Sequence, residues 1–162
     1  MYLLFNKNIY YNILLCFLVV LMQAYAPKVF VTSNVKVGLD FLLVLITFFV
    51  LLKKTYYVIF LGFIFGLLQD FMINVEAIGL CSFIKSLSVY YLSKIKLNNN
   101  LWIRSFKFFY IFLVYFLHFF IYYSIINTEI SFLFTYLSIL HAFFAIVIFY
   151  VFEKTLFNSC LL

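Results

Sequence analysis

Charged residues are scarce in this sequence, and acidic residues are the scarcest. Only 10% of the 162 residues are charged, with 5 Asp and Glu against 11 Lys and Arg, while 69% are hydrophobic. A soluble domain is about half apolar and about a quarter charged. A soluble globule has no interior for so many apolar side chains, so the composition excludes a water-soluble fold and predicts an all-α integral membrane protein.

Glycine and cysteine are also rare, with 4 and 3 residues respectively. No glycine-rich loop is present that could bind phosphate, and the cysteines show neither a CxxC motif nor a Cys/His ligand spacing. Nothing assembles a nucleophile, a general base and oxyanion donors. We therefore predict that the chain is not an enzyme, with no catalytic residue, no cofactor and no metal site.

Apolar runs separated by short polar segments predict six transmembrane helices in a single domain over residues 1–162. A span needs about 20 residues, so six spans leave only short loops. The predicted spans cover approximately residues 9–25, 37–52, 56–72, 77–95, 108–126 and 130–152. The first span has features of a signal peptide, but Pro27 directly follows the small-residue motif at 24–26 and disfavours cleavage. We predict that this helix is retained.

Basic residues gather on one side of the predicted spans. Eight of the eleven fall in segments that share one side, namely Lys7, Lys53, Lys54, Lys94, Lys96, Arg104, Lys107 and Lys154. The positive-inside rule then predicts that both termini are cytoplasmic. The net charge of +6 comes from basic residues at the ends of the predicted helices, where they set the orientation in the membrane. We therefore predict no nucleic-acid partner.

Two acidic residues fall inside apolar spans, where a charge costs about 2.5–3.5 kcal/mol on insertion scales. Asp40 would lie one turn into the second span, where the helix dipole favours a negative charge. Asp70 follows Gly62 and Gly66 at intervals of four, so the three share one row of the third helix. Two glycines on such a row allow close helix packing, so we predict that this row faces protein.

Lys85 is the one basic residue predicted to lie well inside a span, away from its ends. It falls on the fourth helix at a depth comparable with that of Asp70 on the third. We therefore predict an Asp70–Lys85 ion pair, which would offset the cost of burying either charge. The alternative is that Lys85 extends alone toward the membrane surface.

The two histidines, His118 and His141, lie inside the last two predicted spans. They could belong to a proton path or a metal site. Two histidines without a nearby carboxylate are more often hydrogen-bonded packing residues, and we favour that interpretation.

Several motifs between residues 37 and 95 resemble the MreD family of rod shape-determining proteins. They are Asp40 followed by the apolar run 41–46, the sequence Gly62-Phe-Ile-Phe-Gly66-Leu-Leu-Gln-Asp70, Ile78-Gly79-Leu80, and Tyr90-Tyr91-Leu92. A proline that is common in the family before the second span is replaced here by Gly38-Leu39, and a lysine at position 85 is unusual for it. The overall length and the six-span plan agree with the family.

This resemblance implies a fold and a function that composition alone could not supply. The fold would resemble the S-components of energy-coupling-factor transporters. The protein would be a non-catalytic component of the bacterial cell-elongation machinery in the inner membrane. It would act with MreC and the elongation peptidoglycan synthase complex within the lipid bilayer. Asp40, Gly62, Gly66, Asp70, Gly79 and Lys85 are the candidate helix-packing or partner-contact residues.

Two other functions remain open from the sequence. The first is a small-molecule-binding S-component-like subunit of a vitamin transporter, which needs a polar pocket near the outer face. The short outer turns carry few hydrogen-bonding side chains and count against it. The second is a proton-coupled carrier that would use Asp70, Lys85 and the histidines.

Overall fold

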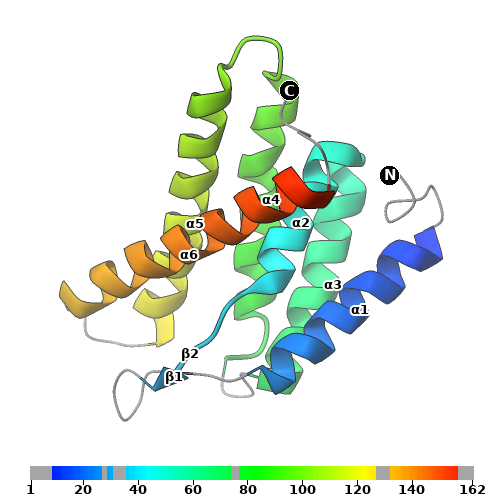
Figure 1. Cartoon of the computed structure of the whole chain (residues 1–162). Coiled ribbons are helices and arrows are strands. Elements are labelled where there is room, and N and C mark those ends of the chain that lie inside the picture. Colours follow the sequence, from blue (N-terminus) through cyan, green and yellow to red (C-terminus); the bar gives the residue numbers. More distant parts are fainter. Residues whose placement is uncertain (1–8, 27–28, 31–35, 74–76, 127–131, 157–162) are drawn as a thin grey trace.

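The computed structural model describes residues 9–26, 29–30, 36–73, 77–126 and 132–156. Within these ranges the chain forms six α-helices and one antiparallel pair of two-residue strands (Figure 1). The elements are α1 (Ile9–Tyr25), β1 (Val29–Phe30), β2 (Lys36–Val37), α2 (Phe41–Leu52), α3 (Thr55–Ile73), α4 (Leu80–Leu97), α5 (Arg104–Ile126) and α6 (Phe132–Leu156). The predicted helical fold is confirmed. Lys7, Pro27 and the turns at 74–76 and 127–129 lie outside the described residues.

Three of the described helices, α3, α5 and α6, are long and apolar enough to cross a membrane. Two others are apolar but shorter, with 17 residues in α1 and 12 in α2. The 18 residues of α4 include three lysines and four serines, which lower its hydropathy. The protein is therefore a membrane protein with three candidate spans, and the count of six crossings stays a prediction.

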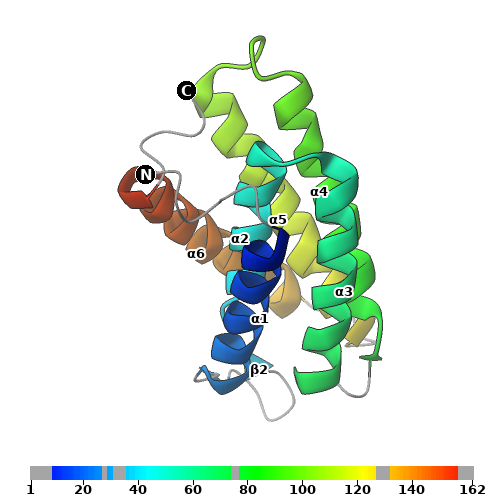
Figure 2. The same cartoon turned by 90° about the vertical axis from the view of Figure 1, so that its right-hand side faces the viewer.

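α2 lies among the other helices and contacts α1, α3, α4 and α6. α4 contacts α2, α3 and α5, and its most extensive contact is with α3. α6 crosses the molecule obliquely, at a steep inclination to α4 and α5, and packs on α5 and α2 (Figures 1 and 2). Polar side chains on the inner faces of α2 and α4 are consequently enclosed by protein.

The core lies around α2, in which eight of twelve residues are buried. A helix that is apolar on every side is expected to be buried in this way. Thr47 of α2 shares a 2.8 Å hydrogen bond with the hydroxyl of Tyr115 on α5, and Tyr115 is fully buried. Large apolar side chains on the outer helices are exposed instead, for example Phe60 on α3 and Phe143 on α6. This arrangement suits a lipid environment.

The second helix begins four residues later than predicted. Val37 belongs to β2, and Asp40 is the N-cap of α2, with its Oδ1 accepting a 3.0 Å hydrogen bond from the Leu43 amide. Asp40 therefore does not lie one turn into the helix. An Asp before an apolar run is a common helix start, because its carboxylate satisfies a free amide of the first turn.

The helix ends alternate between two ends of the molecule. The α2–α3 turn, the α4–α5 loop and the C-terminal end of α6 lie toward one end, and the β1–β2 hairpin lies at the other (Figure 1). The first group carries Lys53, Lys54, Lys94 and Lys96. The assignment of this end to the cytoplasm stays a prediction.

Candidate functional site

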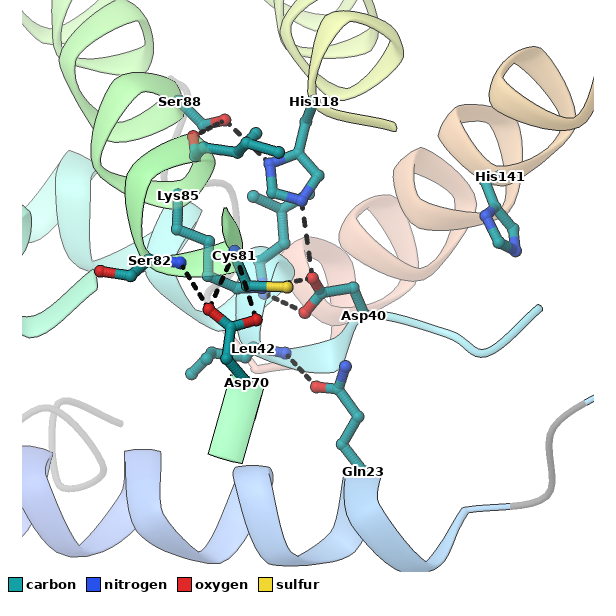
Figure 3. A network of polar contacts seen from close by, with 12 residues as sticks. Gln23, Asp40, Leu42, Asp70, Cys81, Ser82, Lys85, Ser88, His118 and His141 are labelled. Atoms are coloured by element: carbon teal, nitrogen blue, oxygen red, sulfur yellow. Dashed lines mark hydrogen bonds and ion pairs between the residues drawn. The ribbon is translucent and has the colours of Figure 1, made fainter. Parts of the chain in front are cut away.

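A buried cluster of polar side chains lies at the N-terminal end of α2 (Figure 3). Lys85 of α4 donates from Nζ to Asp40 Oδ2 at 2.5 Å, and the two side chains are 0% and 7% exposed. This contact is a buried ion pair between residues 45 positions apart in the chain. Such a pair offsets the cost of taking either charge away from water.

His118 of α5 extends this cluster to a third helix. Its Nε2 lies 3.7 Å from Asp40 Oδ2, and its Nδ1 shares a 3.0 Å hydrogen bond with Ser88 Oγ on α4. The Ser88 hydroxyl also lies 2.8 Å from the Ile84 carbonyl. We call Asp40, Lys85, Ser88 and His118 the polar cluster, and it connects α2, α4 and α5.

The prediction for the histidines is confirmed in one respect and wrong in another. Both are hydrogen-bonded between helices, since His141 Nδ1 of α6 lies 2.8 Å from the Tyr123 hydroxyl of α5. The premise that no carboxylate lies near them is wrong for His118, because Asp40 is its neighbour. Among the described residues no three His, Cys, Asp or Glu side chains are placed to bind a metal ion.

Asp70 of α3 lies at the N-terminus of α4. Its carboxylate accepts hydrogen bonds from the amides of Gly79 at 3.0 Å, Cys81 at 3.1 Å and Ser82 at 3.4 Å. The N-cap residue of α4 is Gly79, which has no side chain to accept these amides. Asp70 supplies the missing acceptor from the neighbouring helix, and its negative charge also favours the helix N-terminus.

The predicted Asp70–Lys85 ion pair is therefore wrong. Asp70 is occupied by backbone amides of α4, whereas Lys85 lies one turn further along that helix and reaches Asp40. The prediction rested on the similar depths of Asp70 on α3 and Lys85 on α4. Depth alone did not show that α2, with Asp40 at its start, packs next to Lys85. Lys85 is fully buried, so the alternative of a lysine extending to the surface is wrong as well.

We expect Asp70→Ala to destabilise the protein by about 1–2 kcal/mol, in the upper range for the loss of a helix cap. Asp70→Asn should lose less, because an amide oxygen can still accept from the α4 amides. The free energy of unfolding in mixed detergent–SDS micelles measures both variants. Equal stability of Asp70→Ala and the wild type would contradict a capping role for this carboxylate.

Gly66 is the point of closest approach between α3 and α4. A Cβ atom at Gly66 would lie 2.5 Å from Ser82 Cα and 2.8 Å from Ser82 N, which is closer than any real contact of this kind. A Cβ at Gly62 would meet its nearest atom, Val89 Cγ2, at an ordinary 3.5 Å. Of the two glycines, only Gly66 is therefore required for the close contact.

Gly79 has a different reason to be glycine. Its φ angle of 94° lies in the left-handed region, and no atom of the described residues lies within 4 Å of a Cβ built there. A side chain would fit in the available space but would strain the backbone. This conformation turns the chain into α4 and directs the Gly79 amide to Asp70.

A cavity of about 130 Å³ adjoins the polar cluster. It extends from Asp40 and His118 toward the end of the molecule that carries the β1–β2 hairpin, where Gly38, Leu39 and Ile73 line it. Its polar lining comes from five helices and the residue before α2, and comprises Gln23, Asp40, Gln69, Cys81, His118, Tyr122, Tyr123 and His141. Gln23 and Gln69 were not predicted as site residues, although an uncharged amide in an apolar run is itself a signal of internal contact.

Comparison with known proteins identifies a family for this chain. Residues 6–159 match the family model of rod shape-determining protein MreD. No individual curated protein and no solved structure matches the chain. Nothing in these comparisons supports the alternative of a vitamin-transporter subunit. The match covers nearly the whole chain, and we conclude that this membrane protein belongs to the MreD family of rod shape-determining proteins.

Proposed function

We propose that this chain is a non-catalytic component of the bacterial cell-elongation machinery in the inner membrane. It would act as a scaffold or regulator of peptidoglycan synthesis together with MreC and the elongation peptidoglycan synthase complex. The observation that carries this proposal is the match to the family of rod shape-determining proteins over residues 6–159. The composition supports the membrane location.

The contacts of the buried polar residues support a packing role for them. Asp40 and Lys85 face each other, and Asp70 faces the α4 backbone. All three side chains are at most 9% exposed. We propose that these residues, with Gly66 and Gly79, fix the positions of α2, α3 and α4, while Gly62 lies in ordinary contact on the same row of α3. Partner proteins would then contact the outward faces of the helices.

Charge distribution supports an orientation with both termini in the cytoplasm. The end of the molecule that contains the α2–α3 turn and the α4–α5 loop is rich in lysine and arginine. Arg104 there lies 3.4 Å from Glu153 of α6, which is fully buried, so one basic side chain also joins α5 to α6. The β1–β2 hairpin would face the periplasm.

The proposed partnership predicts that MreC co-purifies with the affinity-tagged chain from solubilised membranes of a rod-shaped bacterium. An unrelated polytopic protein with the same tag is the control and should not retain MreC. We also expect cells that lose this protein to become round and to regain rod shape when it is restored. Rod-shaped growth without the protein, or absence of MreC from the purified material, would contradict the proposal.

A further inference from the structure

The cavity beside the polar cluster contains two buried polar groups without a hydrogen-bond partner. They are Gln69 Oε1 on α3 and His141 Nε2 on α6, and within the part of the chain that the structure describes no donor or acceptor contacts either atom. Both side chains are 4% exposed, and both line the cavity. Buried polar atoms are nearly always hydrogen-bonded, so unpartnered ones on a cavity wall point to a bound molecule.

The position of His141 Nε2 follows from the contact of the other ring nitrogen. Nδ1 is occupied by the Tyr123 hydroxyl at 2.8 Å, and the ring packs against Phe119 with centroids 4.9 Å apart. Two neighbours therefore fix the imidazole. In Figure 3 the ring extends from α6 on the same side as Asp40, and the two residues line the same cavity.

The charge of the cavity selects a neutral ligand. Asp40 contributes a carboxylate to the lining. Lys85, which does not line the cavity, neutralises this charge with its Nζ 2.5 Å from Asp40 Oδ2. No Lys or Arg is among the described residues that line the cavity, so a phosphate or carboxylate would face Asp40 without a free cation. An anionic ligand is therefore disfavoured, and the ion pair leaves little net charge to attract a cation.

The hydrogen-bonding pattern selects hydroxyl groups. Gln69 Oε1 can only accept, whereas His141 Nε2 donates or accepts according to its tautomer. A hydroxyl both donates and accepts, so it satisfies either tautomer. The Phe119 ring and the apolar side chains of Leu39 and Ile73 on the same wall suit carbon atoms that carry such hydroxyls.

The volume limits the size of the ligand. An apolar cavity of about 150 Å³ holds one benzene molecule, with about six heavy atoms. Ordinary small-molecule pockets measure about 300–1,000 Å³. A cavity of about 130 Å³ is therefore too small for a vitamin and matches a molecule of the size of glycerol.

We propose that this cavity binds a neutral, glycerol-sized polyhydroxyl group through Gln69 and His141. Two sources offer this chemistry, namely a free polyol and the terminal glycerol of a phosphatidylglycerol headgroup. Either would enter from the end of the molecule near Leu39, which is 38% exposed. This inference does not depend on the proposed partnership with MreC.

The chain offers a specific spectroscopic probe of this cavity. It contains two histidines, His118 and His141, and both line the cavity. Protein labelled with ¹⁵N in histidine and purified without a histidine tag therefore reports only from this region in an NMR spectrum. We expect glycerol to shift the His141 ring resonances with a saturable, millimolar dependence in detergent.

Lipid nanodiscs distinguish the two sources. If the headgroup is the ligand, the same shift will be present in phosphatidylglycerol nanodiscs without added polyol, and absent in phosphatidylethanolamine nanodiscs. If a free polyol is the ligand, both nanodiscs will give the unshifted spectrum until glycerol is added. A spectrum that responds to neither phosphatidylglycerol nor glycerol, or responds to glycerol without saturation, would overturn the proposal and leave a cavity filled by water.

A matched pair of substitutions tests the role of Gln69. Gln69→Leu should raise the apparent dissociation constant at least tenfold. Asn12→Leu is the control, because Asn12 is 1% exposed and its amide oxygen has no hydrogen-bond partner among the described residues, but Asn12 does not line the cavity. Equal affinity of Gln69→Leu and the wild type would overturn the assignment. Should Gln69→Leu fail to fold, the wild-type titrations alone still decide the proposal.

Discussion

Lys85→Met is expected to lower the free energy of unfolding by about 3–5 kcal/mol, the usual cost of breaking a buried ion pair on one side. The methionine fills a similar volume but leaves the carboxylate of Asp40 without its 2.5 Å partner. His118 and the Leu43 amide remain as neighbours of Asp40 and replace only part of the lost interaction. Unfolding in mixed detergent–SDS micelles measures the change.

Two companion variants show whether this loss comes from the pair. Lys96→Met removes an exposed lysine from the same helix and should change stability by less than about 0.5 kcal/mol. The double variant Asp40→Asn/Lys85→Met removes both charges and keeps a residue that can cap α2. We expect it to be more stable than Lys85→Met alone. Additive losses from the two single substitutions would show that the pair contributes no coupling energy.

Gly66→Ala is expected to destabilise the protein by about 2–3 kcal/mol, toward the upper end of the range for overpacking. The added methyl group would lie 2.5 Å from the Cα atom of Ser82. The methyl carbon is attached directly to the backbone of α3 and the Ser82 Cα belongs to the backbone of α4, so the clash is relieved only if the two helices separate. The separation would also lengthen the hydrogen bonds that the Asp70 carboxylate accepts from the amides at the start of α4.

Gly62→Ala is the matched control for this substitution. It lies one turn earlier on the same helix, where the new methyl group meets its neighbours at 3.5 Å or more. Alanine is favoured over glycine inside a helix by about 0.5–1 kcal/mol, so Gly62→Ala should be neutral or slightly stabilising. Equal losses from both substitutions would show that the close contact at Gly66 is not the cause.

Local sequence patterns predicted the positions of the helices well, but they did not predict which helices pack against one another. Apolar runs placed all of the described helices, because each run is long enough to be recognised without tertiary information. The start of α2 was predicted too early, since Val37 continues the apolar run although it belongs to a strand. Asp40 carried a signal for the true start, because an Asp before an apolar run commonly caps a helix.

The pairing of charges could not be read from the sequence. A spacing of four identified one face of α3 and correctly indicated that Asp70 faces protein. It did not indicate that Asp70 accepts hydrogen bonds from backbone amides of α4, because every residue type except proline carries such an amide. Lys85 and Asp40 are 45 residues apart, and their contact requires α2 to pack against α4. This packing depends on how all six described helices assemble.

Cavity residues were the hardest to predict. Gln69 directly precedes Asp70, and the charge of Asp70 is the stronger signal in that apolar run. His141 was predicted as a packing residue, which describes its Nδ1 contact with Tyr123 but not its Nε2, which has no hydrogen-bond partner among the described residues. An unfilled volume arises from the shapes of many side chains together, so no single position in the sequence reveals it.

The capping of α4 by Asp70 has a consequence for how the protein is made. Within the described structure the start of α4 has no side chain of its own that accepts its first amides, and Asp70 comes from the preceding helix. Inside a membrane no water is present to accept hydrogen bonds from such amides. The hairpin of α3 and α4, rather than either helix alone, is thus the smallest piece of the described chain in which these amides have acceptors, and we expect the two helices to insert into the membrane together.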